Sequence, residues 1–147
     1  MMKITKRPAK KDDEALVRKI RRDAYYDVVT EQFGTWDEPA QDIFFKNSWK
    51  PETHDIILVD DVPGGYTEIE RAADHIYIHE LVISPEFQGK GIGTGILAEL
   101  KEEALKKGVP IYLQVLKKNK AQGLYLRMGF KDVGSTDTHF KMTYSSK

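Results

Sequence analysis

The sequence contains no cysteine among its 147 residues. This absence excludes disulfide bonds, thiolate metal ligands and a cysteine nucleophile, and it suits a reducing cytoplasm. No apolar run approaches the roughly 20 residues of a membrane-spanning helix. The amino terminus, MMKITKRPAKKDDE, also lacks the apolar stretch of a signal peptide. We therefore expect a soluble, cytoplasmic protein that does not enter a membrane.

A net charge is missing as well, because 23 basic side chains balance 23 acidic ones. No overall field therefore favours binding to nucleic acid or to an anionic membrane surface. The chain also lacks internal repeats, low-complexity segments and linkers. Its length suits a single domain, which we expect to span residues 1–147.

The hydrophobic periodicity alternates between strand-like and helix-like segments. Asp12 or Asp13 is expected to cap the first helix. The pattern predicts a mixed α/β sheet with helices on both faces. Strands are expected at 2–7, 55–59, 65–70, 75–83, 110–116, 130–134 and 138–144, and helices at about 12–29, from TWDEP to Pro51, from Ile92 to Gly108, and at 119–129.

Residues 87–95, FQGKGIGTG, carry a glycine at every second position between an expected strand and an expected helix. Such a junction presents free backbone N–H groups and the positive end of the helix dipole, which together favour an anion such as phosphate. The alternative is a turn that merely connects the two elements, although a connector needs only one or two glycines.

Two familiar phosphate-binding loops do not fit this stretch. A Walker loop fails because Gly91 follows Gly89-Lys90 and Ser84 stands five positions before Gly89. The dinucleotide pattern Gly-x-Gly-x-x-Gly fails because Thr94 and Ile96 occupy its third glycine position. The pattern that remains is Gln-x-x-Gly-x-Gly, formed by Gln88, Gly91 and Gly93.

Two further blocks accompany this pattern: LVISP at 81–85, and a later block with Asn119, Ala121, Tyr125, Gly129 and Phe130. With these motifs the chain closely resembles the GCN5-related N-acetyltransferase (GNAT) family. The resemblance implies a mixed, mostly antiparallel sheet that is splayed between its fourth and fifth strands. It covers nearly the whole chain in the order of elements.

The resemblance also implies a site for acetyl-coenzyme A as cosubstrate. Main-chain groups of Leu81, Val82 and Ile83 would pair with the pantetheine arm. Asn119 would add a side-chain contact, or it serves as a plain helix cap. The pyrophosphate would lie against Gln88, Gly89, Lys90, Gly91, Gly93 and Thr94.

Acetyl transfer to an amine needs a proton acceptor and a proton donor. Tyr125 matches the family's general acid, and its alternative role is that of a core tyrosine. Glu80 is a carboxylate among β-branched residues and is the preferred base. Strict alternation places it on one face with Ile76, Ile78 and Val82, unless a bulge resets the register. His79 and a solvent proton path are the alternatives.

We therefore expect an N-acetyltransferase, an acyltransferase that moves the acetyl group to a primary amine by direct attack in a ternary complex. A non-catalytic acetyl-coenzyme A sensor is the alternative. The acceptor, a small molecule or a peptide amine, is not specified. In TEQFGTWDEP, Glu31, Asp37 and Glu38 could attract a cationic amine on which Phe33 and Trp36 could stack, or these residues form a solvated loop and its packing anchors. No metal is expected, because His75 and His79 lie roughly 13 Å apart along a strand. A homodimer is one assembly left open.

Overall fold

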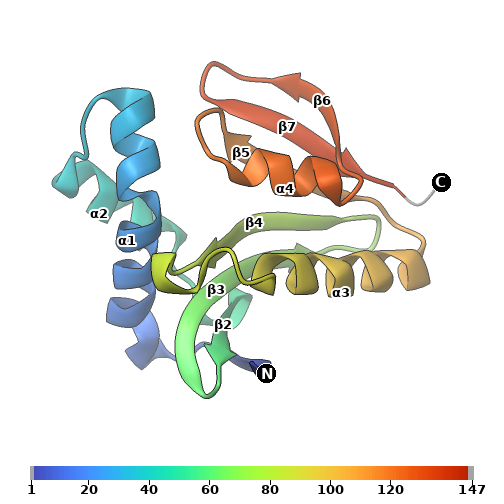
Figure 1. Cartoon of the computed structure of the whole chain (residues 1–147), viewed down its shortest axis with the longest axis horizontal. Coiled ribbons are helices and arrows are strands. Elements are labelled where there is room, and N and C mark those ends of the chain that lie inside the picture. Colours follow the sequence, from blue (N-terminus) through green and yellow to red (C-terminus); the bar gives the residue numbers. More distant parts are fainter. Residues whose placement is uncertain (1, 146–147) are drawn as a thin grey trace. The chain divides into compact units, whose positions relative to one another are not determined.

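The computed structural model describes residues 2–145, and its elements follow the order expected from the sequence (Figure 1). Most boundaries agree with the expected ones to within a few residues. The strands are β1 (Ile4–Pro8), β2 (His54–Val59), β3 (Val62–Arg71), β4 (Ile76–Ile83), β5 (Ile111–Leu116), β6 (Lys131–Ser135) and β7 (His139–Tyr144), and the α-helices are α1 (Glu14–Phe33), α2 (Glu38–Ser48), α3 (Ile92–Lys107) and α4 (Ala121–Arg127).

The strands form a seven-stranded sheet in the order β1-β2-β3-β4-β5-β7-β6. Pairing of β1 with β2, β2 with β3, β5 with β7 and β6 with β7 is antiparallel, whereas β4 and β5 are parallel. The parallel register joins Ile76–Ile78 to Ile111–Leu113, which is three residues of the eight in β4. A mixed, mostly antiparallel sheet with a parallel pair at its fourth and fifth strands is thereby confirmed.

The chain divides into two compact units. The first unit comprises the residues up to Glu68 together with Glu80–Gln88, and the second comprises Ile69–His79 together with the residues from Gly89 onward. Strands β3 and β4 each contribute residues to both units. The single domain expected from the chain length stays a prediction.

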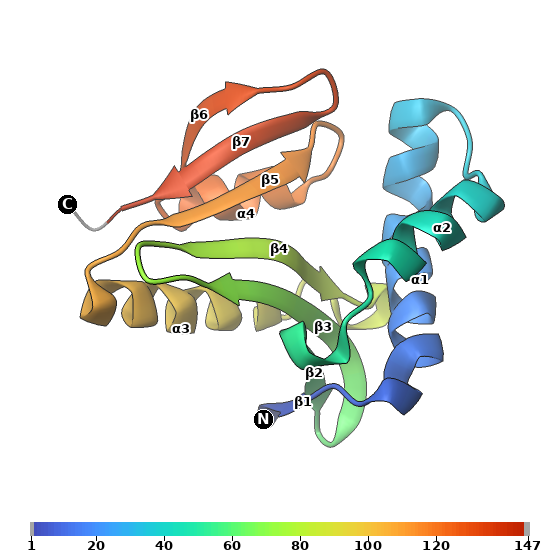
Figure 2. The ribbon, with the colours of Figure 1, turned by 180° about the vertical axis from the view of Figure 1, so that it is seen from behind.

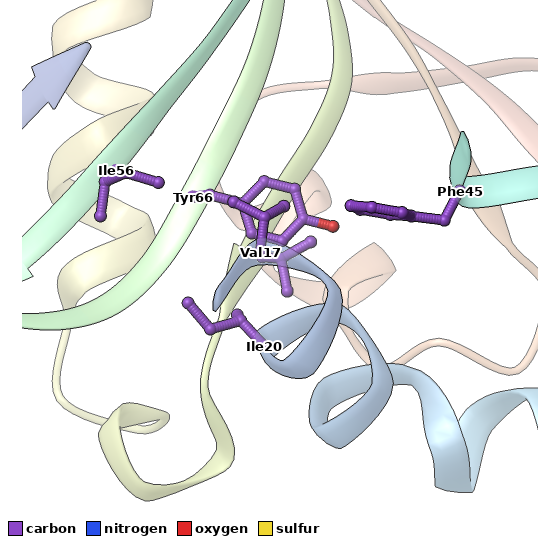
Figure 3. Packing of buried hydrophobic residues seen from close by; sticks show 6 residues of the cluster. Val17, Ile20, Phe45, Ile56 and Tyr66 are labelled. Carbon is purple, nitrogen blue, oxygen red and sulfur yellow. The ribbon is translucent and has the colours of Figure 1, made fainter. Parts of the chain in front are cut away.

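The first unit has a core in which two helices pack against three strands. The ring of Tyr66 lies at its centre, with Ile56 and Phe45 on opposite sides and Val17 and Ile20 beside it (Figure 3). Tyr66 and Ile56 are fully buried. Burying an aromatic and several aliphatic side chains contributes roughly 1.5–3 kcal/mol each to folding. The cluster is formed by Val17 and Ile20 of α1, Phe45 of α2, Ile56 of β2, Tyr66 of β3 and Val82 of β4.

The second unit is built on strands β5, β7 and β6, with α4 across one face of them (Figure 2). Alternate residues of β5 are buried, as expected for a half-exposed strand. Helix α3 buries one stripe and is followed by Gly108, whose left-handed conformation lets the Val109 N–H donate to the Ala104 carbonyl at 3.0 Å. The buried stripe consists of Ile92, Ile96, Leu97, Leu100 and Ala104.

Two local expectations were wrong. Asp13 precedes α1, but its side chain does not cap that helix, because its carboxylate accepts hydrogen bonds from Arg7 and from the Lys10 N–H. The turn after β2 is also shorter than the stretch DDVPG (60–64) that separates the expected strands 55–59 and 65–70. Asp60 and Asp61 adopt positive φ angles of 49° and 67° and complete the turn, so that β3 begins at Val62.

Within residues 2–145, no helix has both the length and the apolar character that crossing a membrane requires.

Candidate active site

Glu80 lies in the first unit with both carboxylate oxygens engaged. The Tyr66 hydroxyl donates to Oε2, and Nε of Arg21 lies 3.7 Å from Oε1. Only 15% of the Glu80 side chain is exposed. Burial raises the pKa of the Glu80 carboxyl above its usual range, although the Tyr66 hydrogen bond and the Arg21 charge act in the opposite direction. The result is a carboxylate with a strengthened affinity for a proton.

Tyr66 is a donor whose protonation does not change near neutral pH. Burial, followed by the negative charge of Glu80, raises the pKa of the Tyr66 phenol well above its usual value. The phenol therefore keeps its proton and donates it to the hydrogen bond with Glu80. The alternation expected for β4 holds here. Glu80 and Val82 are two residues apart, and both lie beside Tyr66: Glu80 accepts its hydrogen bond, and Val82 belongs to the same core cluster.

Arg21 is itself held in place from two helices. Its Nη1 donates to Oε1 of Gln41 on α2 at 2.9 Å. The guanidinium lies over the rings of Tyr25, 5.4 Å from the centroid, and Phe44, 5.1 Å from the centroid. Planar stacking and a side-chain hydrogen bond restrict the guanidinium. Arg21 therefore presents a fixed positive charge to Glu80.

His79, the alternative base, lies in the second unit in a different setting. Its Nε2 is 3.0 Å from Oε1 of Glu70, and its ring packs against Tyr77 with centroids 4.6 Å apart. The His79 side chain is 41% exposed. Its hydrogen bond lowers the pKa of the Glu70 carboxyl. His79 thus forms an exposed pair with Glu70, and Glu80 belongs to a separate buried group.

The strand residues expected to pair with pantetheine follow the paired part of β4. Val82 is buried, whereas Leu81 and Ile83 are half-buried. Ile76–Ile78 of the same strand pair with β5. On the side of β3, the Ser84 N–H donates to the Gly64 carbonyl at 2.9 Å.

Two structural roles at this end of β4 escaped the sequence reasoning. The side-chain amide of Gln88 donates to the Ile83 carbonyl at 2.9 Å and ties the loop to the strand. At Gly65 an added Cβ would clash with the Val82 carbonyl oxygen, so a side chain has no room there. The GG pair in VPGGY was a sequence signal for such a close approach.

The glycine loop of the second unit ends at the amino end of α3. Gly89 and Gly91 have φ angles of 76° and 83°, which strongly favour glycine. The Gly95 N–H donates to the Gly91 carbonyl, so the three preceding N–H groups, at 92–94, have no acceptor within the helix. Lys90 and Thr94 are exposed beside them. This geometry suits an anion.

Gly93 has an additional role that the sequence did not reveal. Its Cβ would lie 3.2 Å from Cδ2 of Leu124, so the missing side chain lets α3 and α4 approach within the second unit. By contrast, a Cβ at Gly91 or Gly95 would meet no atom of the described chain within 4 Å. Gly93 therefore serves packing, and a contact with pyrophosphate stays a prediction.

Tyr125 and Asn119 lie in the second unit at α4. Tyr125 is 6% exposed, and its ring meets Phe130 edge-on with centroids 5.6 Å apart. Burial alone raises the pKa of its phenol to about 12. Oδ1 of Asn119 accepts from the Ala121 N–H at 2.9 Å, which gives Asn119 the capping role considered as its alternative.

The acidic residues expected near an acceptor amine have local partners. Asp37 caps α2 by accepting from the Ala40 N–H at 3.1 Å. Glu38 accepts from Trp36 Nε1 at 2.6 Å and lies 3.5 Å from Nε of Arg22. These contacts favour the packing alternative for Trp36, Asp37 and Glu38. Among residues 2–145, no group of three or more His, Asp or Glu side chains is arranged to hold a metal ion.

Comparison with known proteins agrees with this arrangement of elements. The profile of the acetyltransferase (GNAT) family matches residues 17–130. A curated relative, acetyltransferase ECA0875 of Pectobacterium atrosepticum, is 26% identical over 129 residues, which cover 80% of this chain and 88% of the relative. The chain therefore belongs to the GNAT family of acetyltransferases, and its class of activity is acyl transfer.

Solved structures share the fold. The PaiA N-acetyltransferase of Thermoplasma acidophilum, solved in complex with coenzyme A, has a TM-score of 0.79 at 19% identity over 97% of this chain and 99% of its own. PH1933 of Pyrococcus horikoshii OT3 has a TM-score of 0.75 at 24% identity over 99% of each chain. At these identities the likeness concerns the fold.

Proposed function

We propose that the protein transfers the acetyl group of acetyl-coenzyme A to a primary amine, with Glu80 as the proton acceptor. The observation that carries this proposal is the carboxylate of Glu80, largely buried and held between Tyr66 and Arg21. A carboxylate accepts the proton of the amine more readily when its own pKa is higher, and burial raises the pKa of the Glu80 carboxyl towards that of the amine. A packing residue would need no charge at this place.

The reaction follows from attack within a ternary complex. The neutral amine nitrogen forms a bond to the thioester carbonyl carbon, and Glu80 takes the amine proton directly or through a water molecule. The carbon–sulfur bond then breaks, and Tyr125 gives its proton to the departing thiolate. A phenol with a pKa of about 12 stays protonated at neutral pH. Because it is then a weaker acid than the thiol it forms, its proton moves as the carbon–sulfur bond breaks, and the phenolate regains a proton from solvent.

The residues of the glycine loop fit the pyrophosphate of the cosubstrate. The positive φ angle of Gly91 and the open space at its Cβ leave room for a phosphate against the first N–H groups of α3. Lys90 supplies a charge and Thr94 a hydroxyl. Gln88, Gly89, Gly93 and Asn119, with the main chain of Leu81–Ile83, complete the proposed set.

A cytoplasmic location and a small-molecule or peptide acceptor belong to the same proposal. The cysteine-free composition suits a reducing compartment. The acidic residues Asp37 and Glu38 beside Trp36 are engaged locally and do not identify the acceptor.

Release of free thiol from acetyl-coenzyme A tests the proposal. The native protein is mixed with a panel of polyamines, amino sugars, amino acids and peptides, and cosubstrate binding is measured separately by calorimetry. Turnover that depends on one class of amine supports the proposal. Tight binding without turnover on any amine would instead identify a sensor.

A further inference from the structure

Two residues, Tyr66 and Arg21, contact the carboxylate of Glu80. Tyr66 contacts one carboxylate oxygen and Arg21 approaches the other. Neither comes from the glycine loop or from the later motif block, and each lies on a different element. Tyr66 is on β3, and Arg21 is on α1.

We propose that Tyr66 and Arg21 are positioning residues that fix the orientation of Glu80 and keep its carboxylate ionised until it accepts the proton of the amine. This inference rests on the proposed role of Glu80 as base. It adds two residues that act through Glu80 without touching the reacting atoms.

Tyr66 is suited to positioning Glu80 because close packing restricts its side chain. It is fully buried and lies within the cluster formed by α1, α2 and the strands of the first unit (Figure 3). A donor fixed by close packing loses little conformational freedom when it forms its hydrogen bond. The carboxylate is therefore oriented by the core itself.

Arg21 supplies the charge that a largely buried carboxylate requires. Burial favours the protonated form of Glu80, and a protonated carboxyl group cannot accept a proton from the amine. The Tyr66 hydrogen bond and the Arg21 charge both favour the ionised form. Loss of either residue should therefore make Glu80 hold its proton to a higher pH.

Other titratable groups also face this carboxylate. His54 of β2 favours the ionised form of Glu80, whereas Glu68 of β3 opposes it. The two form their own pair, with His54 Nε2 3.7 Å from Glu68 Oε1, and the His54 ring lies 5.9 Å from that of Tyr66. On α1, Tyr25 faces Tyr66 and Arg21. Because His54 and Glu68 act in opposite directions, we expect Tyr66 and Arg21 to dominate.

The test follows the protonation of Glu80 directly by NMR of the protein labelled with ¹³C at the glutamate side-chain carboxyl. Glu80→Gln identifies the resonance by its disappearance. Tyr66→Phe keeps the buried ring and removes only the hydroxyl, and Arg21→Gln removes the charge. Lys19→Gln is the matched control, because Lys19 is an exposed cation on the same helix that pairs with Asp23. Melting temperatures verify that each variant folds.

We expect the titration midpoint of Glu80 to rise by about one pH unit in Tyr66→Phe and in Arg21→Gln, and to stay in place in Lys19→Gln. The acid limb of kcat/KM should move with it, so that activity below the limb falls about tenfold while the plateau changes little. A purely structural role would lower activity at every pH.

An unchanged midpoint in Tyr66→Phe, or an equal shift in Lys19→Gln, would overturn the inference. The inference would also be overturned if the titration midpoint of the Glu80 resonance rose in a variant while the acid limb of its kcat/KM profile stayed in place. The NMR titration does not depend on turnover. A native protein without acetyl transfer would thus refute the proposed function, and the control of Glu80 by Tyr66 and Arg21 would still be measured.

Discussion

Glu80 on β4 and Glu70 on β3 are two carboxylates with similar partners and opposite behaviour. Each accepts a hydrogen bond, Glu80 from Tyr66 and Glu70 from His79. The Glu80 side chain is 15% exposed and that of Glu70 is 53% exposed. Burial raises the pKa of Glu80, whereas the His79 hydrogen bond lowers the pKa of Glu70. Access to solvent, and not the presence of a donor, decides the direction.

This difference separates the two candidate bases. A carboxylate whose proton affinity is raised by burial is suited to accept a proton near neutral pH. His79, in contrast, already directs Nε2 to an exposed carboxylate. The comparison therefore favours Glu80 as the base and gives His79 a local hydrogen bond with Glu70.

Tyr125→Phe should produce the largest loss among the variants of the second unit. Turnover with acetyl-coenzyme A is expected to fall by about 10²-fold, because the proton donor is lost, while the packing of the ring on Phe130 is kept. The loss should be smaller with an acetyl donor whose thiol is more acidic. Steady-state kinetics with both donors measure it. Equal losses with both, or a large drop in melting temperature with little kinetic change, would assign Tyr125 to packing.

Gly91→Ala should weaken cosubstrate binding by at least about tenfold, or about 1.4 kcal/mol. The left-handed backbone at Gly91 disfavours a side chain by about 1–2 kcal/mol, and the added Cβ would enter the space proposed for phosphate. Calorimetry with coenzyme A measures the affinity.

Gly95→Ala is the matched control for this substitution. Gly95 lies in the same helix turn without a positive φ angle and with open space at its Cβ. Alanine there should keep the affinity and stabilise the helix by about 0.5–1 kcal/mol. If both substitutions weakened coenzyme A binding equally, the proposed phosphate site at Gly91 would be contradicted. Gly93 is a poorer probe, because a side chain there meets Leu124.

The smallest expected effect is on stability, and it compares the two glutamates directly. The pKa of Glu80 is raised in the folded protein, so its carboxyl stabilises the fold below the unfolded value of 4.5 and loses this contribution as pH rises through the folded pKa. The free energy of unfolding of the native protein, relative to Glu80→Gln, should therefore fall with rising pH.

Glu70 should show the opposite slope. Its pKa is lowered in the folded protein, so its contribution is present above the unfolded value of 4.5 and is lost as pH falls through the folded pKa. Urea denaturation of the native protein, Glu80→Gln and Glu70→Gln across this range measures both slopes. Slopes of the same sign would show that the two carboxylates do not differ as described.

The sequence was sufficient for the order of elements, for the glycine loop between a strand and a helix, and for the position of Glu80 in β4. Each of these depends on local patterns: strict alternation in β4, and strand, glycines and helix in succession at 81–95. The family resemblance added acetyl-coenzyme A as the proposed ligand.

The partners of Glu80 could not be predicted, because they depend on long-range packing. Tyr66 is 14 residues away from Glu80 in the sequence, and Arg21 comes from α1. One signal was present: Arg21 lies four residues after Val17, so it shares the buried face of α1. No pattern in the sequence indicated that Leu124 packs close to Gly93.

The central claim, that Glu80 is the proton acceptor, is tested most directly by kcat/KM of Glu80→Gln and His79→Gln measured against pH with one accepted amine. We expect Glu80→Gln to lose about 10²-fold together with the acid limb, and His79→Gln to stay within about threefold of the native value with the limb retained. A Glu80→Gln enzyme within about threefold of native, or a larger loss in His79→Gln, would contradict the account.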